Sequence, residues 1–257
     1  MSSFVITGTS RGIGLELVAQ LLQYPQAEVS HIFAITRSNP SPQLQDLLQR
    51  HQGRLFNVIV QDLTDNARVA SAVSEIEAAL LTGQGIDYLI DNAGIMPWTS
   101  PVSAAKKEVL LDCFNVNVVA AHTITSALIP LLSKGDKKTV VNLSTAMGSI
   151  AYTPCYTFAQ TPEYKISKAA MNMLTAQYAL EFADQGFTFL AISPGGVKTD
   201  LGGPSGDLEV SIAVQAIREI LVDEGRKERN GKFFNVRVEG WESAEGPNQY
   251  DGREIPW

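Results

Sequence analysis

The sequence predicts a doubly wound α/β fold of about seven parallel strands with helices on both faces. Short β-rich runs alternate along the chain with longer helical patterns, which is typical of βαβ units. Most of the short runs are continuously apolar, as strands covered on both faces require. The 257 residues contain no internal repeat or linker, so they fit a single domain spanning 1–257.

The predicted strands are rich in β-branched and aromatic residues and span 3–7, 31–37, 54–60, 86–91, 138–144, 187–193 and 231–236. The predicted helices lie between them, at 12–24, 42–51, 65–82, 102–132, 162–185 and 207–224. In the helix at 65–82 an apolar stripe runs through positions 69, 73, 76 and 80. Parallel βαβ units place a binding crevice at the carboxyl ends of the strands.

Composition excludes several classes of function. The net charge of −7 argues against a nucleic-acid partner, which would need an excess of Lys and Arg. No apolar run approaches the ~20 residues that cross a bilayer, so no membrane partner is expected. The N-terminus enters a strand at once and leaves no room for a signal peptide. Cys113 and Cys155 lack metal-ligand spacing, and we expect a cytoplasmic protein without a metal site.

The first strand leads into TGTSRGIG (7–14), whose glycines are spaced G-x3-G-x-G rather than in the standard dinucleotide fingerprint. Glycine lets the backbone turn tightly and approach a pyrophosphate, which the free N–H groups of the following helix bind. The alternative is a Gly-rich turn without a ligand. The turn predicts a dinucleotide site formed by Gly8, Ser10, Arg11, Gly12, Ile13 and Gly14.

The second strand indicates which nucleotide binds. An NAD site offers an acidic residue about 20 residues beyond the glycines, but no Asp or Glu lies between His31 and Gln45. Thr36 and Arg37 end this strand instead, and Arg11 adds a second cation. Guanidinium and hydroxyl groups suit a 2′-phosphate, which favours NADP(H). Solvated surface arginines are the alternative.

A tyrosine and a lysine stand four residues apart in EYKISK (163–168). On a helix, Tyr164 and Lys168 share one face. An ammonium stabilises a phenolate, and a phenol tuned in this way can protonate a carbonyl oxygen. A substrate oxygen also needs a donor, which Ser144 or Thr145 offers. A coincidental surface pair is the alternative for YxxxK alone.

Six motifs occur in order along nearly the whole chain: TGTSRGIG, DNAG (91–94), FNVNVVA (114–120), VVNLST (140–145), YKISK (164–168) and PGGVKTD (194–200). Together they resemble the short-chain dehydrogenase/reductase family, whose fold is the Rossmann fold. The closing GKFFNV and IPW are similar to fungal ketoreductases and sniffer-like carbonyl reductases within that family.

The resemblance implies further cofactor contacts. It places Asp62 and Leu63 at the adenine, and Asn92, Ala93 and Gly94 at the adenosine ribose, although Asn92 could equally stabilise its own turn. It places Pro194, Gly195, Val197 and Thr199 at the nicotinamide. Asp91 departs from the family pattern, which more often has Asn there.

The resemblance also assigns catalytic roles. Tyr164 supplies the proton, and Lys168 holds the nicotinamide ribose. Thr145 stands in the register of the family's serine, but its methyl group crowds the site, so Ser144 could share the task. Asn117 matches an asparagine that anchors a proton-supplying water; a structural Asn is the alternative.

Two segments bear on the substrate. The stretch AYTPCYTFAQTPE (151–163) is longer than usual in the family, and could wall a pocket for a flat or bulky ketone or pack on the protein's own surface. The Gly-rich segment 201–211 suggests a lid.

The function expected is NADPH-dependent reduction of a small ketone or aldehyde. The alternatives are a non-catalytic NADP(H) sensor and a recruited isomerase or cyclase. The resemblance implies pairing through helices 102–132 and 162–185, as a homodimer or homotetramer.

Overall fold

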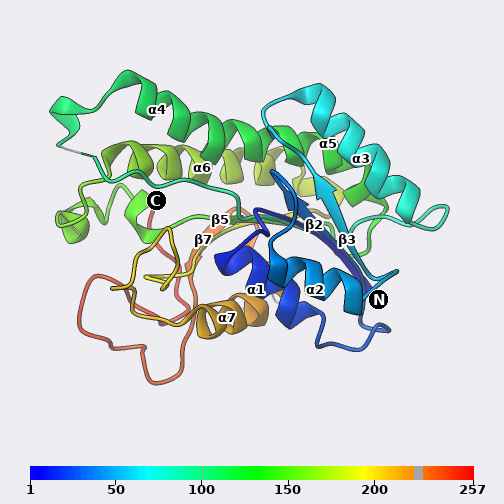
Figure 1. The fold of residues 1–257 in the computed structure, drawn as a ribbon. Helices are drawn as coiled ribbons and strands as arrows, with labels where there is room; N and C mark the ends of the chain where they lie inside the picture. The colour runs from blue at the N-terminus through cyan, green and yellow to red at the C-terminus, as the bar shows by residue number, and fades with distance from the viewer. Residues whose placement is uncertain (100, 223–227) are drawn as a thin grey trace.

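The computed structural model describes residues 1–99, 101–222 and 228–257. Seven parallel strands in these residues form one sheet in the order β3-β2-β1-β4-β5-β6-β7 (Figure 1). The predicted doubly wound fold is confirmed. The chain runs outward from β1 to β3 and then returns to place β4 beside β1, so the strand order reverses there. Such a reversal opens a crevice at the carboxyl ends of the strands.

The strands are β1 (Ser2–Thr7), β2 (Val29–Thr36), β3 (Leu55–Ile59), β4 (Tyr88–Asp91), β5 (Thr139–Leu143), β6 (Thr188–Ser193) and β7 (Lys232–Asn235). Each lies within two residues of its predicted run. Every residue of β5 and β6 is buried, as parallel strands between two helical layers require.

The long helices are α1 (Gly12–Leu21), α2 (Pro42–Arg50), α3 (Asn66–Ala79), α4 (Lys107–Phe114), α5 (Ala120–Lys134), α6 (Pro162–Glu181) and α7 (Val210–Val222). Helices α1 and α7 cover one face of the sheet, and α3, α5 and α6 cover the other (Figure 1). The last two residues of the helix predicted at 207–224 lie outside the described residues.

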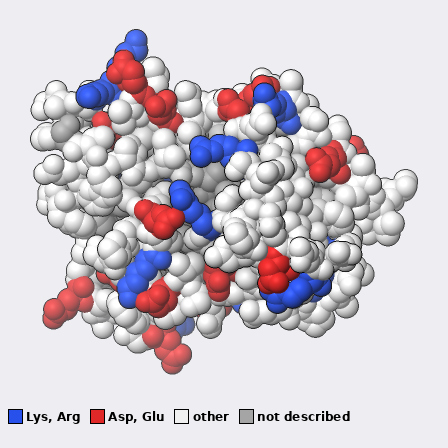
Figure 2. Space-filling model, in the orientation of Figure 1, with Lys and Arg blue, Asp and Glu red and all other residues white. Residues whose placement is uncertain are grey.

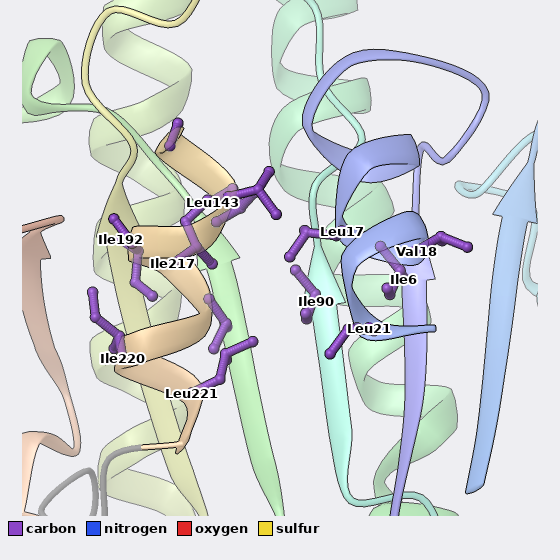
Figure 3. Close-up of a cluster of buried hydrophobic side chains, with 14 of the residues drawn as sticks. Ile6, Leu17, Val18, Leu21, Ile90, Leu143, Ile192, Ile217, Ile220 and Leu221 are labelled. Carbon is purple, nitrogen blue, oxygen red and sulfur yellow. The ribbon is translucent and has the colours of Figure 1, made fainter. Parts of the chain in front are cut away.

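The hydrophobic core has separate parts on the two faces of the sheet, because successive strand side chains point to opposite faces. In β1, Ile6 packs against α1, and Figure 3 shows it close to Leu17 and Val18 of that helix. Its neighbour Val5 belongs to the opposite layer, together with Ile76 of α3. Successive residues of β1 therefore contribute to two separate hydrophobic clusters, one on each face of the sheet.

Helix α3 differs slightly from its predicted pattern. Asp65 caps its N-terminus by accepting hydrogen bonds from the backbone N–H groups of residues 67 and 68. Its buried residues are Val69, Ala72 and Ile76 rather than positions 69, 73, 76 and 80. Leu80 lies beyond the helix end, because the helix stops at Ala79.

The prediction of a single helix over residues 102–132 is wrong. A short 3₁₀ turn, Val102–Ala104, precedes α4, and a π-helical turn, Asn115–Val119, joins α4 to α5. A π-turn inserts one extra residue per turn and so reorients the side chains around it. The inserted turn contains Asn117, which it turns toward the crevice.

The helical stretch Lys107–Lys134 is long and apolar enough to cross a membrane by length and composition, which corrects the expectation that no such run exists. Within the described residues it is a core helix, since 56% of its apolar window is buried inside the fold. Ile124, Leu128 and Leu132 are fully buried in the cluster that covers the sheet. Its hydrophobicity is therefore explained by packing.

Acidic and basic side chains are interspersed over the face shown in Figure 2. That face presents no broad basic surface, in keeping with the net charge of −7.

The C-terminal tail returns alongside β7. The Asn235 N–H donates to the carbonyl of Arg253 at 3.0 Å, and the Ile255 N–H donates to the carbonyl of Phe233 at 2.7 Å. The ring of Trp257 stacks on Phe233, with centroids 5.6 Å apart. The tail thus covers the outer edge of the sheet.

Candidate active site

The sequence motifs meet at one edge of the sheet. Gly8 follows β1, Asn92 follows β4, Ser144 follows β5 and Pro194 follows β6. These are neighbouring parallel strands, so their carboxyl ends lie side by side. The site forms along the crevice that the topology predicts.

The glycine turn has the geometry of an anion cradle. Gly8 and Gly12 have φ angles of 71° and 57°, which favour glycine. A Cβ on Gly14 would lie 2.4 Å from the Gly8 carbonyl oxygen, so no larger residue fits. No side chain caps α1, which leaves the N–H groups at its N-terminus for a ligand. These features fit a pyrophosphate.

Asn92 supports this turn from behind. Its Nδ2 donates to the carbonyls of Thr7 and Gly8 at 2.8 and 3.0 Å. The Thr7 hydroxyl oxygen in turn accepts from the N–H groups of Asn92 and Ala93, each at 3.0 Å. The side chain of Asn92 therefore joins β4 to the glycine turn, and Ala93 and Gly94 continue from it along the crevice.

The end of β2 presents Arg37 to solvent. Thr36, by contrast, is buried, and its hydroxyl contacts the Ser38 carbonyl at 2.8 Å and Asn57 Oδ1 at 3.2 Å. Arg11 pairs with Asp200 at 3.0 Å across the crevice. Thr36, Arg37 and Arg11 are the three residues expected at a 2′-phosphate. Thr36 and Arg11 make the contacts just given, whereas the side chain of Arg37 takes part in neither of them.

Asp62 is exposed after β3, and Leu63 beside it is half-buried. Asp62 Oδ1 accepts from the hydroxyl and N–H of Thr64 at 2.7 and 2.8 Å. These hydrogen bonds lower the pKa of the Asp62 carboxyl. The turn is rigid and open to solvent, which suits a contact with a base edge.

Tyr164 and Lys168 lie on one face of α6, as their spacing predicts. Their side chains are 6% and 3% exposed, so a coincidental surface pair is ruled out. Lys168 Nζ lies 5.8 Å from the centre of the Tyr164 ring. It donates to the carbonyl of Leu143, at the end of β5, at 2.7 Å. The lysine therefore connects α6 to the crevice.

The electrostatics of this pair differ from expectation. Burial, with a smaller contribution from Cys113, raises the pKa of Tyr164 above its usual value. Burial also lowers the pKa of Lys168 to about 8, which the carboxylate of Asp91 partly opposes. The predicted acidification of the phenol is wrong for this structure, because exclusion of water favours the neutral form of both groups.

Asp91 is an unexpected member of the site. It is 2% exposed, and its Oδ2 accepts from the Thr125 hydroxyl at 2.9 Å. Its Oδ1 has no hydrogen-bond partner among the described residues. Burial raises the pKa of Asp91 to about 7, against the opposing effects of Thr125 and Lys168. The departure from the family's Asn was the sequence signal for this group.

The two candidate hydroxyls are not equivalent. Ser144 Oγ donates to Asn172 Oδ1 at 2.6 Å, so its proton is directed toward α6. Thr145 Oγ1 accepts from the Met147 N–H at 3.3 Å. Within the described part of the chain the Thr145 O–H makes no further hydrogen bond, so this group retains a proton to donate.

Asn117 links the loop after β4 to α6 through its side-chain amide. Its Oδ1 accepts from the Ile95 N–H at 2.8 Å, and its Nδ2 donates to the Ile95 carbonyl and Ser167 Oγ at 3.0 and 2.9 Å. A Cβ on Gly94 would lie 3.1 Å from Asn117 Oδ1 and 3.8 Å from Lys168 Nζ. Gly94, Asn117 and Lys168 therefore converge.

The loop after β6 faces the glycine turn. A Cβ on Gly12 would lie 3.5 Å from the methyl carbon of Thr199. Pro194 and Val197 are buried, and Gly195 has a φ of 80°. We refer to residues 194–199 as the β6 loop.

The segment expected as a lid, 201–211, is paired with the β6 loop. The Lys198 N–H donates to the Leu208 carbonyl, and the Leu208 N–H donates to the Gly196 carbonyl, both at 2.9 Å. These two bonds hold the segment against the loop.

The aromatic stretch 151–163 is partly packed against the protein's own surface and partly exposed to solvent. Tyr156 is buried, and its hydroxyl contacts Asn248 Oδ1 and the Pro247 carbonyl. Phe158 is 65% exposed. The Thr99 N–H donates to the Gln160 carbonyl at 3.2 Å, which joins this stretch to the loop after β4.

The described residues contain no group of three or more His, Cys, Asp or Glu side chains that could hold a metal ion. Cys113 is buried, and burial raises the pKa of its thiol to about 11.

Sequence reasoning missed several contributors to the site. The Leu143 carbonyl and the backbone of Ile95 act through main-chain atoms, which no side-chain motif reveals. Asn172 lies two turns after Tyr164 on α6, and the same helical spacing would have found it. Tyr250 and Asp207, described below, meet across 43 residues.

The fold and these motifs define a family. The short chain dehydrogenase family matches residues 3–208, so the chain belongs to it. Among its relatives, it is 35% identical over 210 residues to a short-chain dehydrogenase/reductase of an Arthrinium species, covering 78% of this chain and 76% of the relative.

Solved structures agree. The carbonyl reductase Sniffer of D. melanogaster superposes with a TM-score of 0.86 at 30% identity, with all of both chains covered. The NADPH-bound carbonyl reductase from chicken fatty liver gives a TM-score of 0.85 at 27% identity, over 100% of this chain and 99% of the other.

Proposed function

We propose that the protein reduces a ketone or aldehyde with NADPH. The observation that carries the proposal is the convergence of Tyr164 and Lys168 with Gly94 and the Leu143 carbonyl, buried at the carboxyl ends of β4 and β5. The likeness to two carbonyl reductases, one of them NADPH-bound, supports it.

The residues present fit the cofactor. The uncapped N-terminus of α1 and the glycine turn would hold the pyrophosphate, and Arg37 would pair with the 2′-phosphate. Ala93 and Gly94 would line the adenosine ribose, and the β6 loop would hold the nicotinamide end. When bound, the nicotinamide supplies the hydride.

The protein's own groups would handle the proton. The Tyr164 phenol is protonated at neutral pH and would donate to the carbonyl oxygen, although burial raises its pKa and so makes it a weaker acid. Thr145 would donate a second hydrogen bond to the same oxygen. Lys168 would stabilise the phenolate left after donation and hold the nicotinamide ribose.

The experiment combines binding and turnover. NADPH binding is followed by fluorescence, and NADPH consumption is followed with a panel of quinones, diketones and aromatic ketones. Tyr164→Phe should keep NADPH affinity and lower kcat by ~10²–10⁴, the usual contribution of a positioned acid. Binding without turnover of any carbonyl, and no effect of Tyr164→Phe, would indicate a sensor. A changed product without net NADPH consumption would indicate an isomerase or cyclase.

A further inference from the structure

We propose that Tyr250 and Asp207 are positioning residues that hold the β6 loop in place for the nicotinamide and couple it to the aromatic stretch before Tyr164. This inference rests on the proposed function, because it concerns how the cofactor's reactive end is held. It involves three segments that are distant in sequence: the β6 loop with Asp207, the aromatic stretch and the C-terminal residues 247–250.

Tyr250 lies directly beneath the β6 loop. Its side chain is 1% exposed, and its hydroxyl oxygen accepts from the Gly196 N–H at 3.1 Å. A Cβ on Gly195 would lie 2.2 Å from Cε1 of Tyr250, so the ring fills the space under the loop. The carbonyl of Gly196 accepts from the Leu208 N–H at 2.9 Å. Gly196 is thus held through both of its backbone polar groups.

Asp207 fixes the direction of this hydrogen bond. Its Oδ2 accepts the Tyr250 O–H in a short hydrogen bond, and also accepts from Asn248 Nδ2 at 2.8 Å. Because the phenol O–H donates its hydrogen bond to the carboxylate, an oxygen lone pair is left to accept from the Gly196 N–H. Burial and Asp207 both raise the pKa of Tyr250, so the O–H stays protonated at neutral pH.

Asn248 extends the network to the aromatic stretch. Its Oδ1 accepts from the hydroxyl of Tyr156 at 2.9 Å. The carbonyl of Tyr156 in turn accepts from Lys165 Nζ at 2.6 Å, next to Tyr164 on α6. A continuous path therefore runs from Gly196 through Tyr250, Asp207, Asn248 and Tyr156 to the helix that carries the proposed proton donor.

A hydrogen-bond network of this kind has two consequences. The β6 loop is held in one conformation before cofactor binds, so less ordering entropy is lost on binding. A ligand that moves the aromatic stretch also displaces Asn248 and, through Asp207, the β6 loop. Carbonyl substrate and NADPH should therefore influence each other's affinity through this path.

The test compares Tyr250→Phe and Asp207→Asn with Tyr88→Phe. Tyr88 is a buried tyrosine whose hydroxyl lies 3.3 Å from the Leu221 carbonyl, under α7 and away from the β6 loop. Hydrogen exchange of the Gly196 amide in the cofactor-free protein reports the loop directly. The dissociation constant of NADPH, from fluorescence titration, reports its effect on binding.

Tyr250→Phe should speed exchange of the Gly196 amide and weaken NADPH binding about fivefold, as the loss of one neutral hydrogen bond implies. Asp207→Asn should shift both in the same direction, and Tyr88→Phe should change neither. Exchange and NADPH affinity equal to wild type in Tyr250→Phe would overturn the positioning role alone. Equal losses in Tyr88→Phe would also overturn it, because they would reflect general destabilisation. Failure of the wild-type protein to bind NADPH would instead overturn the proposed function.

The coupling is tested by adding Tyr156→Phe. If the path is continuous, the effects of Tyr156→Phe and Tyr250→Phe on NADPH affinity in the presence of substrate should be non-additive in the double variant. Additive effects would overturn the coupling.

Discussion

Tyr164 and Lys168 are both buried, and burial shifts the pKa of each side chain toward its neutral form. Burial raises the pKa of the Tyr164 phenol, so the group is protonated at neutral pH but is a weaker acid than a free phenol. Proton donation from Tyr164 would therefore depend on the charge of Lys168 to stabilise the phenolate that forms. Burial lowers the pKa of Lys168 to about 8, which the carboxylate of Asp91 partly opposes, and the ammonium donates to the Leu143 carbonyl. A bound nucleotide would add ribose hydroxyl groups to this environment.

The two hydroxyls after β5 can be separated by substitution. Thr145→Ala should lower kcat by ~10²–10³, since it would remove the donor that we propose for the substrate oxygen. Ser144→Ala leaves Asn172 Oδ1 without its 2.6 Å partner, so it should cost ~1–3 kcal/mol of unfolding free energy. Steady-state kinetics and urea unfolding distinguish the two. The reverse pattern would assign the catalytic hydroxyl to Ser144.

We expect the preference for NADPH over NADH to depend on Arg37. Arg37→Asp should weaken NADPH binding by ~10–150-fold, the range for loss of a hydrogen bond to a charged group, and leave NADH binding within a few fold. Fluorescence titration with both nucleotides measures this. Arg50→Asp is the matched control, because Arg50 is exposed on α2 and pairs with Asp46. Equal weakening of both nucleotides would refute a 2′-phosphate contact at Arg37.

At the scale of the elements, Arg54 stabilises the end of α1. It is 9% exposed, and its guanidinium donates to the carbonyls of Leu21, Leu22, Tyr24 and Val29. The last carbonyls of a helix have no partner within it. A single arginine therefore satisfies both the C-terminal turn of α1 and the start of β2.

Arg54→Leu should lower the unfolding free energy by ~2–4 kcal/mol, because it leaves several buried carbonyls unpaired. Arg50→Leu, on the exposed face of α2, should cost under ~1 kcal/mol. Urea unfolding followed by circular dichroism measures both. Similar small losses for the two variants would show that water replaces the guanidinium at these carbonyls.

The strands and most helices could be predicted from the sequence, but the π-helical turn that interrupts the helix between α4 and α5 could not. Continuous apolar runs located all seven strands, and the Tyr164–Lys168 spacing placed the pair on one helix face. The π-turn at Asn115–Val119 was missed because its cause is tertiary: Asn117 binds Ile95 and Ser167, which are distant in sequence. The pairing of β2 with β3 likewise brings the Thr36 hydroxyl to Asn57, a contact that the sequence did not indicate, while a role for Thr36 in nucleotide binding stays a prediction.

For the molecule as a whole, the buried pair of Asp91 and Lys168 makes stability depend on pH. The folded pKa of Asp91, about 7, lies above the usual value of 3.8 for an Asp side chain, so the cost of its burial grows as pH rises between these values. The folded pKa of Lys168, about 8, lies below the usual value of 10.5 for a Lys side chain, so the cost of its burial is fully present below about pH 8 and is relieved as pH rises toward 10.5. Both costs are largest between pH 7 and 8.

Asp91→Asn should remove the first of these costs. Relative to this variant, the wild-type protein should lose ~1–3 kcal/mol of unfolding free energy as pH rises from about 4 to 7. Urea unfolding at several pH values measures the difference. Asp65→Asn is the control, because Asp65 is a partly exposed helix cap. Parallel pH profiles for wild type and Asp91→Asn would show that Asp91 is charged throughout this range.

Because the C-terminal tail pairs with β7, we expect the C-terminus to tolerate truncation or fusion less well than the N-terminus. An uncovered outer strand is a template for recruiting the strand of another molecule. Residues 253–255 occupy that template through the bonds at Phe233 and Asn235. Removing the last five residues would leave the edge of β7 unpaired and promote self-association. An affinity tag fused after Trp257 would disturb the same tail residues. Fusions are therefore better placed ahead of Met1, which is exposed.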